Sequence, residues 1–150
     1  MSKQNVEYEI ANAPGATEGI LGRGVLRLAR ARYDFAIDGG AVSTITPSFD
    51  YNAVLPNDAV IVGGTINATT ACTSDGSATI AVGTSAGSST TSILIATAVA
   101  SFTIDALINS AATFAAPVKL TAEGKITFTI AVAALSAGVI EVTLLYFVAE

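Results

Sequence analysis

The sequence holds little that could perform acid–base or nucleophilic chemistry, because its 150 residues include no histidine. Without histidine there is no Ser-His-Asp triad, no Cys-His pair, and none of the imidazole ligands that commonly hold zinc. Paired carboxylates remain possible, since glycoside hydrolases need only two of them. The aspartates are Asp34, Asp38, Asp50, Asp58, Asp75 and Asp105.

These aspartates are spread along the chain, and most occupy turn positions, where the side chain accepts hydrogen bonds from the backbone. They form no Asp-x-Asp-x-Asp run of the kind that clusters oxygen ligands around calcium. The single cysteine, Cys72, lies in a strand-like segment and is expected to be a buried, inert thiol. The sequence therefore predicts no catalytic, cofactor-binding or metal-binding residue, and a protein that is not an enzyme.

The arginines are the one cluster with binding potential. Arg23, Arg27, Arg30 and Arg32 are four of the seven basic residues, and no lysine or arginine follows until Lys119. Arginine forks bind carboxylates through two hydrogen bonds, so the cluster could hold an acidic partner surface. The alternative, which we favour, is a charged edge strand that prevents pairing with other chains.

The composition is unusually poor in charge. Hydrophobic residues make up 51% of the chain and charged residues 13%, against about 25% charged in ordinary soluble domains. A chain with this composition has apolar surface to bury, and an assembly interface is one place to bury it. A membrane is not expected, because the longest uncharged stretch, residues 76–104, is rich in Ser, Thr, Gly and Ala. The net charge of −5 argues against a nucleic-acid partner, and we expect a soluble protein without a signal peptide.

The length fits one domain preceded by an arm. Residues 1–22 show no sustained apolar period, and they could form an extended arm that orders only against a partner, or a frayed terminus. Residues 23–150 are predicted to form a β-sandwich. The fold class is therefore all-β, a jelly-roll-like β-sandwich with an extended N-terminal arm, because short strands alternate with turn signals about every 8–12 residues.

Alternating apolar residues predict several strands. Residues 25–37 place Ala29, Ala31, Tyr33 and Phe35 on one face. Asp38-Gly39-Gly40 supplies a reversal, and residues 41–46 return as a second strand. A long strand over residues 59–70 is expected to bend at Gly63 and Gly64. Residues 78–82 predict another strand, and the ambiguous segment 93–116 could hold a helical turn near residues 105–109.

The last two segments are predicted to form a hairpin, with residues 134–138 reversing the chain between them. Residues 125–133 place Ile126, Phe128, Ile130 and Val132 inward, with Thr127 and Thr129 opposite. Residues 139–148 place Ile140, Val142, Leu144, Tyr146 and Val148 inward. The opposite face ends in Leu145 and Phe147, which predicts that this end of the strand is covered on both sides, for example by a neighbouring subunit.

The body of the chain resembles small virion proteins of tailed phages, the capsid decoration or cement proteins. The resemblance rests on residues 49–62, 69–73, 78–83, 124–132 and 137–142, which mainly encode turns and strands. It implies a β-sandwich on the capsid exterior, made in the host bacterial cytoplasm. It also implies a homotrimer, with an extended arm lying on the major capsid protein. The expected partners are thus the major capsid protein and further copies of the chain.

Three functions are consistent with the sequence. The first is a structural virion protein that decorates and stabilises a phage capsid, with Arg23, Arg27, Arg30, Arg32, Leu145 and Phe147 as candidate partner-binding residues. The second is a phage fibre or host-adhesion module that recognises a surface glycan through exposed aromatics and the loop at residues 83–92. The third, an enzyme with a carboxylate pair, would need two of the scattered aspartates to meet in a cleft.

Overall fold

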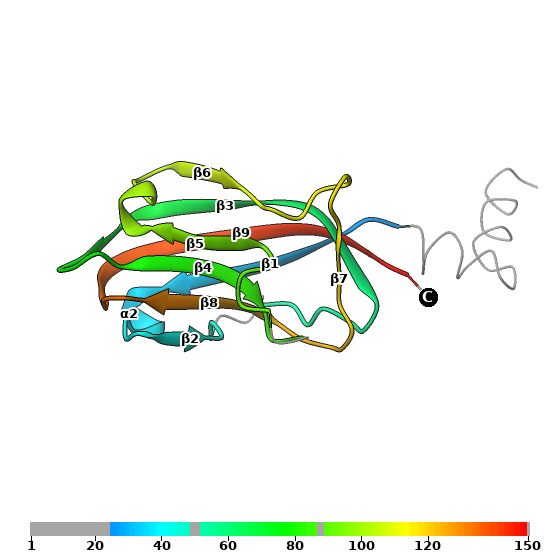
Figure 1. The fold of residues 1–150 in the computed structure, drawn as a ribbon, viewed down its shortest axis with the longest axis horizontal. Coiled ribbons are helices and arrows are strands. Elements are labelled where there is room, and N and C mark those ends of the chain that lie inside the picture. Colours follow the sequence, from blue (N-terminus) through cyan, green and yellow to red (C-terminus); the bar gives the residue numbers. More distant parts are fainter. Residues whose placement is uncertain (1–24, 49–51, 87–88, 150) are drawn as a thin grey trace, which may run out of the picture.

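Two antiparallel sheets pack face to face in the computed structural model, which describes residues 25–48, 52–86 and 89–149 (Figure 1). The first sheet has the order β1-β9-β3-β6, and β7 pairs with β3 beside β6. Its strands are β1 (Arg27–Asp34), β9 (Leu135–Val148), β3 (Ala59–Ser74), β6 (Ala106–Asn109) and β7 (Val118–Lys119). The second sheet has the order β2-β8-β4-β5. Its strands are β2 (Ser43–Ile45), β8 (Ile126–Ala131), β4 (Thr79–Thr84) and β5 (Leu94–Ala98).

Most strands that are neighbours in the sequence lie in opposite sheets. The pairs β1 and β2, β3 and β4, β5 and β6, and β8 and β9 each divide between the two sheets. Short helical segments interrupt them, among them α2 (Phe35–Asp38) and the 3-10 turn η3 (Val99–Ser101). The predicted all-β sandwich is confirmed. The predicted arm at residues 1–22 lies outside the described residues.

The core lies between the sheets and is built from alternate residues of their central strands. Ile140, Val142 and Leu144 of β9 are fully buried, as their alternation predicted. From the second sheet, β8 contributes Phe128, whose ring centroid is 5.6 Å from that of Tyr33 in β1. Each fully buried side chain of this size stabilises the fold by about 1.5–3 kcal/mol.

The predicted hairpin of the last two strands is wrong. β8 pairs with β2 and β4, whereas β9 pairs with β1 and β3. The two strands therefore contribute to the core from opposite sheets. The alternation of apolar residues predicted that each strand has one buried face. Such a face can be buried either in a hairpin of one sheet or between two facing sheets, so the alternation does not decide which strands pair.

A tight turn at Val132 carries the chain from one sheet to the other. The Ala133 N–H donates to the Ala131 carbonyl at 2.9 Å, and Val132 has a φ of 72°. A hydrogen bond across three residues with positive φ at the centre is a strained γ-turn. The prediction that Val132 points inward is therefore wrong, and its side chain is 74% exposed.

Replacing Val132 by glycine is expected to stabilise the protein by up to about 1 kcal/mol, because a β-branched residue is strained at positive φ and glycine is not. Urea unfolding followed by circular dichroism measures the change in the free energy of unfolding. Val132→Ala, which retains a Cβ at the same φ, is the matched control and should change stability less. A Val132→Gly variant less stable than the parent would contradict this account of the turn.

The remaining segments can be compared with the strands predicted from the sequence. The strand predicted over residues 25–37 ends at Asp34, because α2 begins there. Residues 41–46 do contain a strand, β2, but it joins the second sheet. The segment at residues 105–109 is the strand β6 rather than a helical turn. The bend at Gly63 is confirmed by a register shift between Ile61 and Gly63 in the pairing of β3 with β9.

Candidate interaction surfaces

The described residues contain a cavity but no cluster of metal-ligating side chains. No three His, Cys, Asp or Glu side chains in this part of the chain gather where a metal ion could bind. A cavity of about 240 Å³ is lined by Thr84, Ala86, Ser89, Ser92, Val118, Lys119, Leu120 and Thr121. Lys119 is its one charged lining residue, and its Nζ lies 3.1 Å from Oδ1 of Asp58. The cavity thus offers hydroxyl groups and a neutralised lysine, but no acid–base pair.

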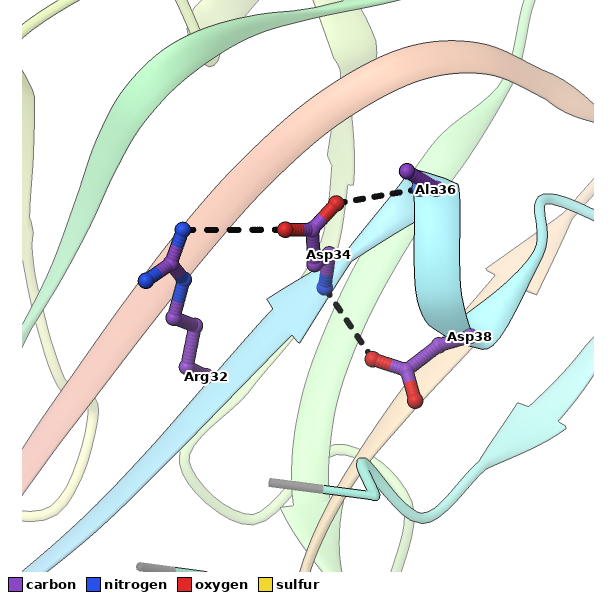
Figure 2. Close-up of polar contacts among 4 residues, drawn as sticks. All are labelled: Arg32, Asp34, Ala36 and Asp38. Atoms are coloured by element: carbon purple, nitrogen blue, oxygen red, sulfur yellow. Dashed lines mark hydrogen bonds and ion pairs between the residues drawn. The ribbon is translucent and has the colours of Figure 1, made fainter.

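The aspartates near α2 hold the backbone, as their turn positions predicted (Figure 2). One carboxylate oxygen of Asp34 accepts from the Ala36 N–H at 3.0 Å and caps α2. The other lies 3.6 Å from Nη2 of Arg32. Asp38 accepts from the N–H groups of Asp34 and Ser48, each at 3.0 Å. These side chains are therefore committed to local structure.

Two further aspartates stand where the chain takes a left-handed conformation. Asp58 has a φ of 63° and Asp105 a φ of 61°. Aspartate tolerates this conformation better than most residues, since its short side chain can bond locally. Asp50 lies outside the described residues. Among the described residues, the aspartates therefore do not support the hypothesis of a catalytic carboxylate pair.

Cys72 is buried, as predicted, against a glycine of the neighbouring strand. A Cβ added to Gly138 would lie 2.5 Å from the Sγ of Cys72, so strands β3 and β9 are in close contact there. Burial raises the pKa of the Cys72 thiol to about 11. A thiol in this state is a poor nucleophile, because the thiolate is the reactive form.

The arginine cluster divides between two faces of an edge strand. Arg30 and Arg32 lie on the outer face of the first sheet, opposite Thr143 and Glu141 of β9. Alternation places Arg27 on the other face, where it is exposed at the start of β1. Arg23 lies outside the described residues. The edge position of β1 fits the interpretation that the arginines protect an edge strand, and their role in partner binding stays a prediction.

An apolar patch continues from these arginines toward the end of the sheet where β1 begins and β9 ends (Figure 1). Leu145 and Phe147 are only partly buried, and Leu145 pairs with Leu28, which is 60% exposed. Leu26, which immediately precedes β1, is also exposed. Leu145 and Phe147 thus form an outer apolar face at this end of β9, and its cover by a partner stays a prediction.

Sequence reasoning missed a second group of exposed apolar residues. Ile95 lies on β5, Ile104 lies just before β6, Leu107 lies on β6, and Phe114 lies in the loop that follows. All four are at least 65% exposed. The signal was present in the sequence, because residues 76–118 contain a single charged residue, Asp105. Within the described part of the chain, no helix is long and apolar enough to cross a membrane.

Comparison with known proteins identifies the fold. No protein-family model matches the sequence, and no curated protein does. Among solved structures, a chain of the acid-stable capsid of Helicobacter pylori bacteriophage KHP30 is 16% identical with a TM-score of 0.59. The alignment covers 85% of this chain and 91% of that one.

Two other phage capsids contain similar chains. A chain of the cyanophage Pam1 capsid is 17% identical with a TM-score of 0.59, over 85% of this chain and 87% of that one. A chain of the capsid of Ralstonia phage GP4 is 16% identical with a TM-score of 0.57, over the same shares. By its fold, this β-sandwich is similar to chains found in the capsids of three bacteriophages.

Proposed function

We propose that this chain is a structural protein of a tailed-phage virion, which decorates the capsid exterior and stabilises it by binding the lattice of the major capsid protein. The observation that carries the proposal is the shared fold, since chains of three phage capsids each match 85% of this chain. The lack of a metal cluster in the described residues and the lack of histidine in the sequence are consistent with a structural role.

The surface of the sandwich suits repeated, individually weak contacts. Arg30 and Arg32 offer charge-assisted hydrogen bonds, and Leu145 and Phe147 offer apolar area beside them. We propose that residues 1–22 lie along the capsid and that the sandwich associates as a homotrimer. Copies joined in this way bind a lattice with avidity, because each further contact is intramolecular once the first has formed.

A host-adhesion module is the second candidate, and one observation favours it. The cavity lined by Thr84, Ser89 and Ser92 lies at the loop predicted to contact a glycan. Sugar-binding faces usually add a stacking aromatic ring, and this cavity has none among its lining residues. Phe114 is exposed but is not part of the lining. We therefore place capsid decoration first.

Deleting residues 1–22 is expected to weaken capsid binding at least tenfold, which corresponds to about 1.4 kcal/mol. The full chain and the deletion variant are added to phage heads assembled without this protein, and the bound fraction is measured by co-sedimentation. The full chain should also raise the melting temperature of the heads, because a ligand that binds only the assembled state stabilises it.

The control is the urea unfolding curve of the deletion variant, which should match that of the full chain if the sandwich is intact. A full chain that neither sediments with the heads nor raises their melting temperature would exclude capsid decoration. Binding of that chain to a glycan array would then support the adhesion module. Equal capsid binding by both variants would exclude the role of the arm.

A further inference from the structure

The apolar residues on the outer face of the first sheet gather at one end of it. Leu28 of β1 pairs with Leu145 of β9, and Phe147 of β9 pairs with Val60 of β3. Leu26 immediately precedes β1, so continuing the register places it beside Phe147. Leu26, Leu28, Leu145 and Phe147 together form what we call the end patch. Clustered exposed apolar residues mark interaction sites, whereas single ones are ordinary.

The cavity described above adjoins the end patch. Lys119 of β7 pairs with Val60, and Val60 pairs on its other side with Phe147. One row of residues across this end of the sheet therefore leads from the end patch to Lys119, which lines the cavity. A surface that joins an apolar patch to a hollow offers a partner side chain a place to insert, which a flat sheet face does not.

The N-terminal arm is joined to the sandwich at this same end. Val25 directly precedes Leu26, so residues 1–24 connect to the sandwich beside the end patch. β9 also ends here, because Val148 pairs with Ala59, the first residue of β3. In Figure 1, the start of β1, the end of β9 and the strand β7 lie at one end of the sandwich. A partner that holds the arm is therefore brought close to the end patch.

The opposite end of the first sheet carries hydroxyl groups. There β9 begins at Leu135, which pairs with Ser74 at the end of β3. The hydroxyl oxygens of Thr73 and Ser136 lie 2.9 Å apart, and the Ser74 hydroxyl donates to the Ala134 carbonyl at 2.6 Å. β9 has 14 residues, which places the two ends about 40 Å apart. Three exposed apolar residues also lie near this end, but in connections between strands rather than on a sheet face: Ile37, Val42 and Val132.

We propose that the sandwich stands on the capsid with the end patch against the major capsid protein and the turn between β3 and β4 pointing away. The inference rests on the capsid decoration proposed above and adds the orientation of the bound chain. The chemistry that fits the end patch is an apolar surface of the capsid protein with carboxylate groups around it. Arg27 and Arg30 flank Leu28 in β1, and arginine at the rim of an apolar patch binds carboxylates through two hydrogen bonds.

The position of the arm selects the capsid lattice as the occupant of the end patch. Once residues 1–22 are bound to the lattice, the end patch is tethered close to that surface, so its own binding becomes an intramolecular step. The opposite end gains less from the same tether because it lies the length of β9 away. Four partly exposed apolar side chains bind weakly alone, and the tether makes their contribution effective.

The test places the same bulky domain at either end of the sandwich. A small folded domain is inserted between Gly76 and Ser77, or is attached after Glu150 through the same short linker. Gly76 and Ser77 are exposed, and the insertion leaves the hydrogen bond from the Gly76 N–H to the Ser74 hydroxyl in place. Co-sedimentation with heads assembled without this protein measures binding. The insertion chimera should bind like the parent chain, and the C-terminal fusion should bind at least tenfold more weakly.

A pair of point variants tests the end patch itself. Leu28→Glu introduces a charge into the end patch and should weaken capsid binding at least tenfold, because the carboxylate loses water when the apolar surfaces meet. Val132→Glu changes an exposed apolar residue at the opposite end, so it is the matched control and should bind like the parent chain. Size exclusion with light scattering should give both variants the molar mass of the parent, and urea unfolding curves should show that both variants and both chimeras are folded.

Four results would overturn this orientation. They are a C-terminal fusion that binds like the parent, a folded insertion chimera that does not bind, a Leu28→Glu variant that binds like the parent, and a lower molar mass of that variant, which would assign the end patch to contacts between copies. The outcome is separable from that of capsid decoration. A parent chain that does not bind heads removes the proposed function, whereas a parent chain that binds with any of these four results removes the orientation alone.

Discussion

Replacing Phe128 by alanine is expected to lower the free energy of unfolding by about 3–5 kcal/mol. The Phe128 ring is fully buried between the two sheets and contacts Tyr33 of the opposite sheet. Truncation removes its apolar contacts and leaves a cavity where β1 and β8 meet, and close-packed strands can only partly collapse into it. The total free energy of unfolding of a domain of this size is about 5–15 kcal/mol, so the loss is a large share of its stability.

The matched control is Thr129→Ala, the next residue of the same strand. Thr129 points the other way, and its hydroxyl lies 2.9 Å from that of Thr44, so its loss should cost only about 0.5–1.5 kcal/mol. Urea unfolding followed by tyrosine fluorescence measures both. Equal losses for the two variants would mean that the core does not lie between the sheets as described.

The free energy of unfolding is expected to fall steeply above pH 9. One buried group with a raised pKa lowers it by up to about 1.4 kcal/mol for each pH unit. Burial raises the pKa of the Cys72 thiol from 9.0 to about 11, so the unfolded chain releases this proton before the folded chain does. The stabilisation is fully present below pH 9 and is lost as the pH rises toward 11. Burial, and then the charges of Cys72, Asp38 and Asp34, also raise the pKa of Tyr33, which steepens the fall above pH 10.

Cys72→Ala isolates the contribution of the thiol. The variant should lose some stability at pH 7, but its free energy of unfolding should decline less between pH 9 and 11 than that of the parent chain. Tyr33→Phe should flatten the decline above pH 10 and also removes the hydrogen bond that Tyr33 donates to the Gly39 carbonyl at 2.7 Å. Identical slopes for the Cys72→Ala variant and the parent chain would show that the thiol is not buried in the folded protein.

The sequence predicted strands well where one face of each strand is buried. Ile140, Val142 and Leu144 alternate with polar residues because β9 has one face on the core, and that pattern is local. It could not predict which sheet a strand joins, because pairing depends on residues far away in the chain. β9 pairs with β1 and β3 rather than with β8, although the turn at Val132 is short enough for a hairpin.

Tertiary packing also overrode the local pattern at single residues. Thr127 was placed on the face opposite the core-facing residues, yet it is buried. It pairs with Gly83, and a Cβ added there would meet the backbone of Ser89 and Thr90, so that segment covers the outer face at this point. No feature of residues 125–133 encodes this cover. The left-handed conformation of Asp58 and Asp105, by contrast, agrees with the prediction that the aspartates serve turns.

Of the candidate site, the sequence could predict composition but not arrangement. It identified Leu145 and Phe147 as a second apolar face and the arginines as a cluster. The alternation of β1 then separates Arg27 from Arg30 and Arg32. The second group of exposed apolar residues (Ile95, Ile104, Leu107 and Phe114) was missed because its members come from two strands, a turn and a loop, which share no period in the sequence.

The central position of β9 in the first sheet determines when that sheet can form during protein synthesis. β1 ends at Asp34 and β3 at Ser74, but the strand that joins them begins only at Leu135. While the ribosome is still translating the segment between, β1 lacks the strand that it pairs with in the first sheet, and an unpaired strand of this kind invites aggregation. The arginines of β1 then act as gatekeepers of the nascent chain, since charge repels a second unpaired strand. The sandwich completes its first sheet only after its last strand has left the exit tunnel.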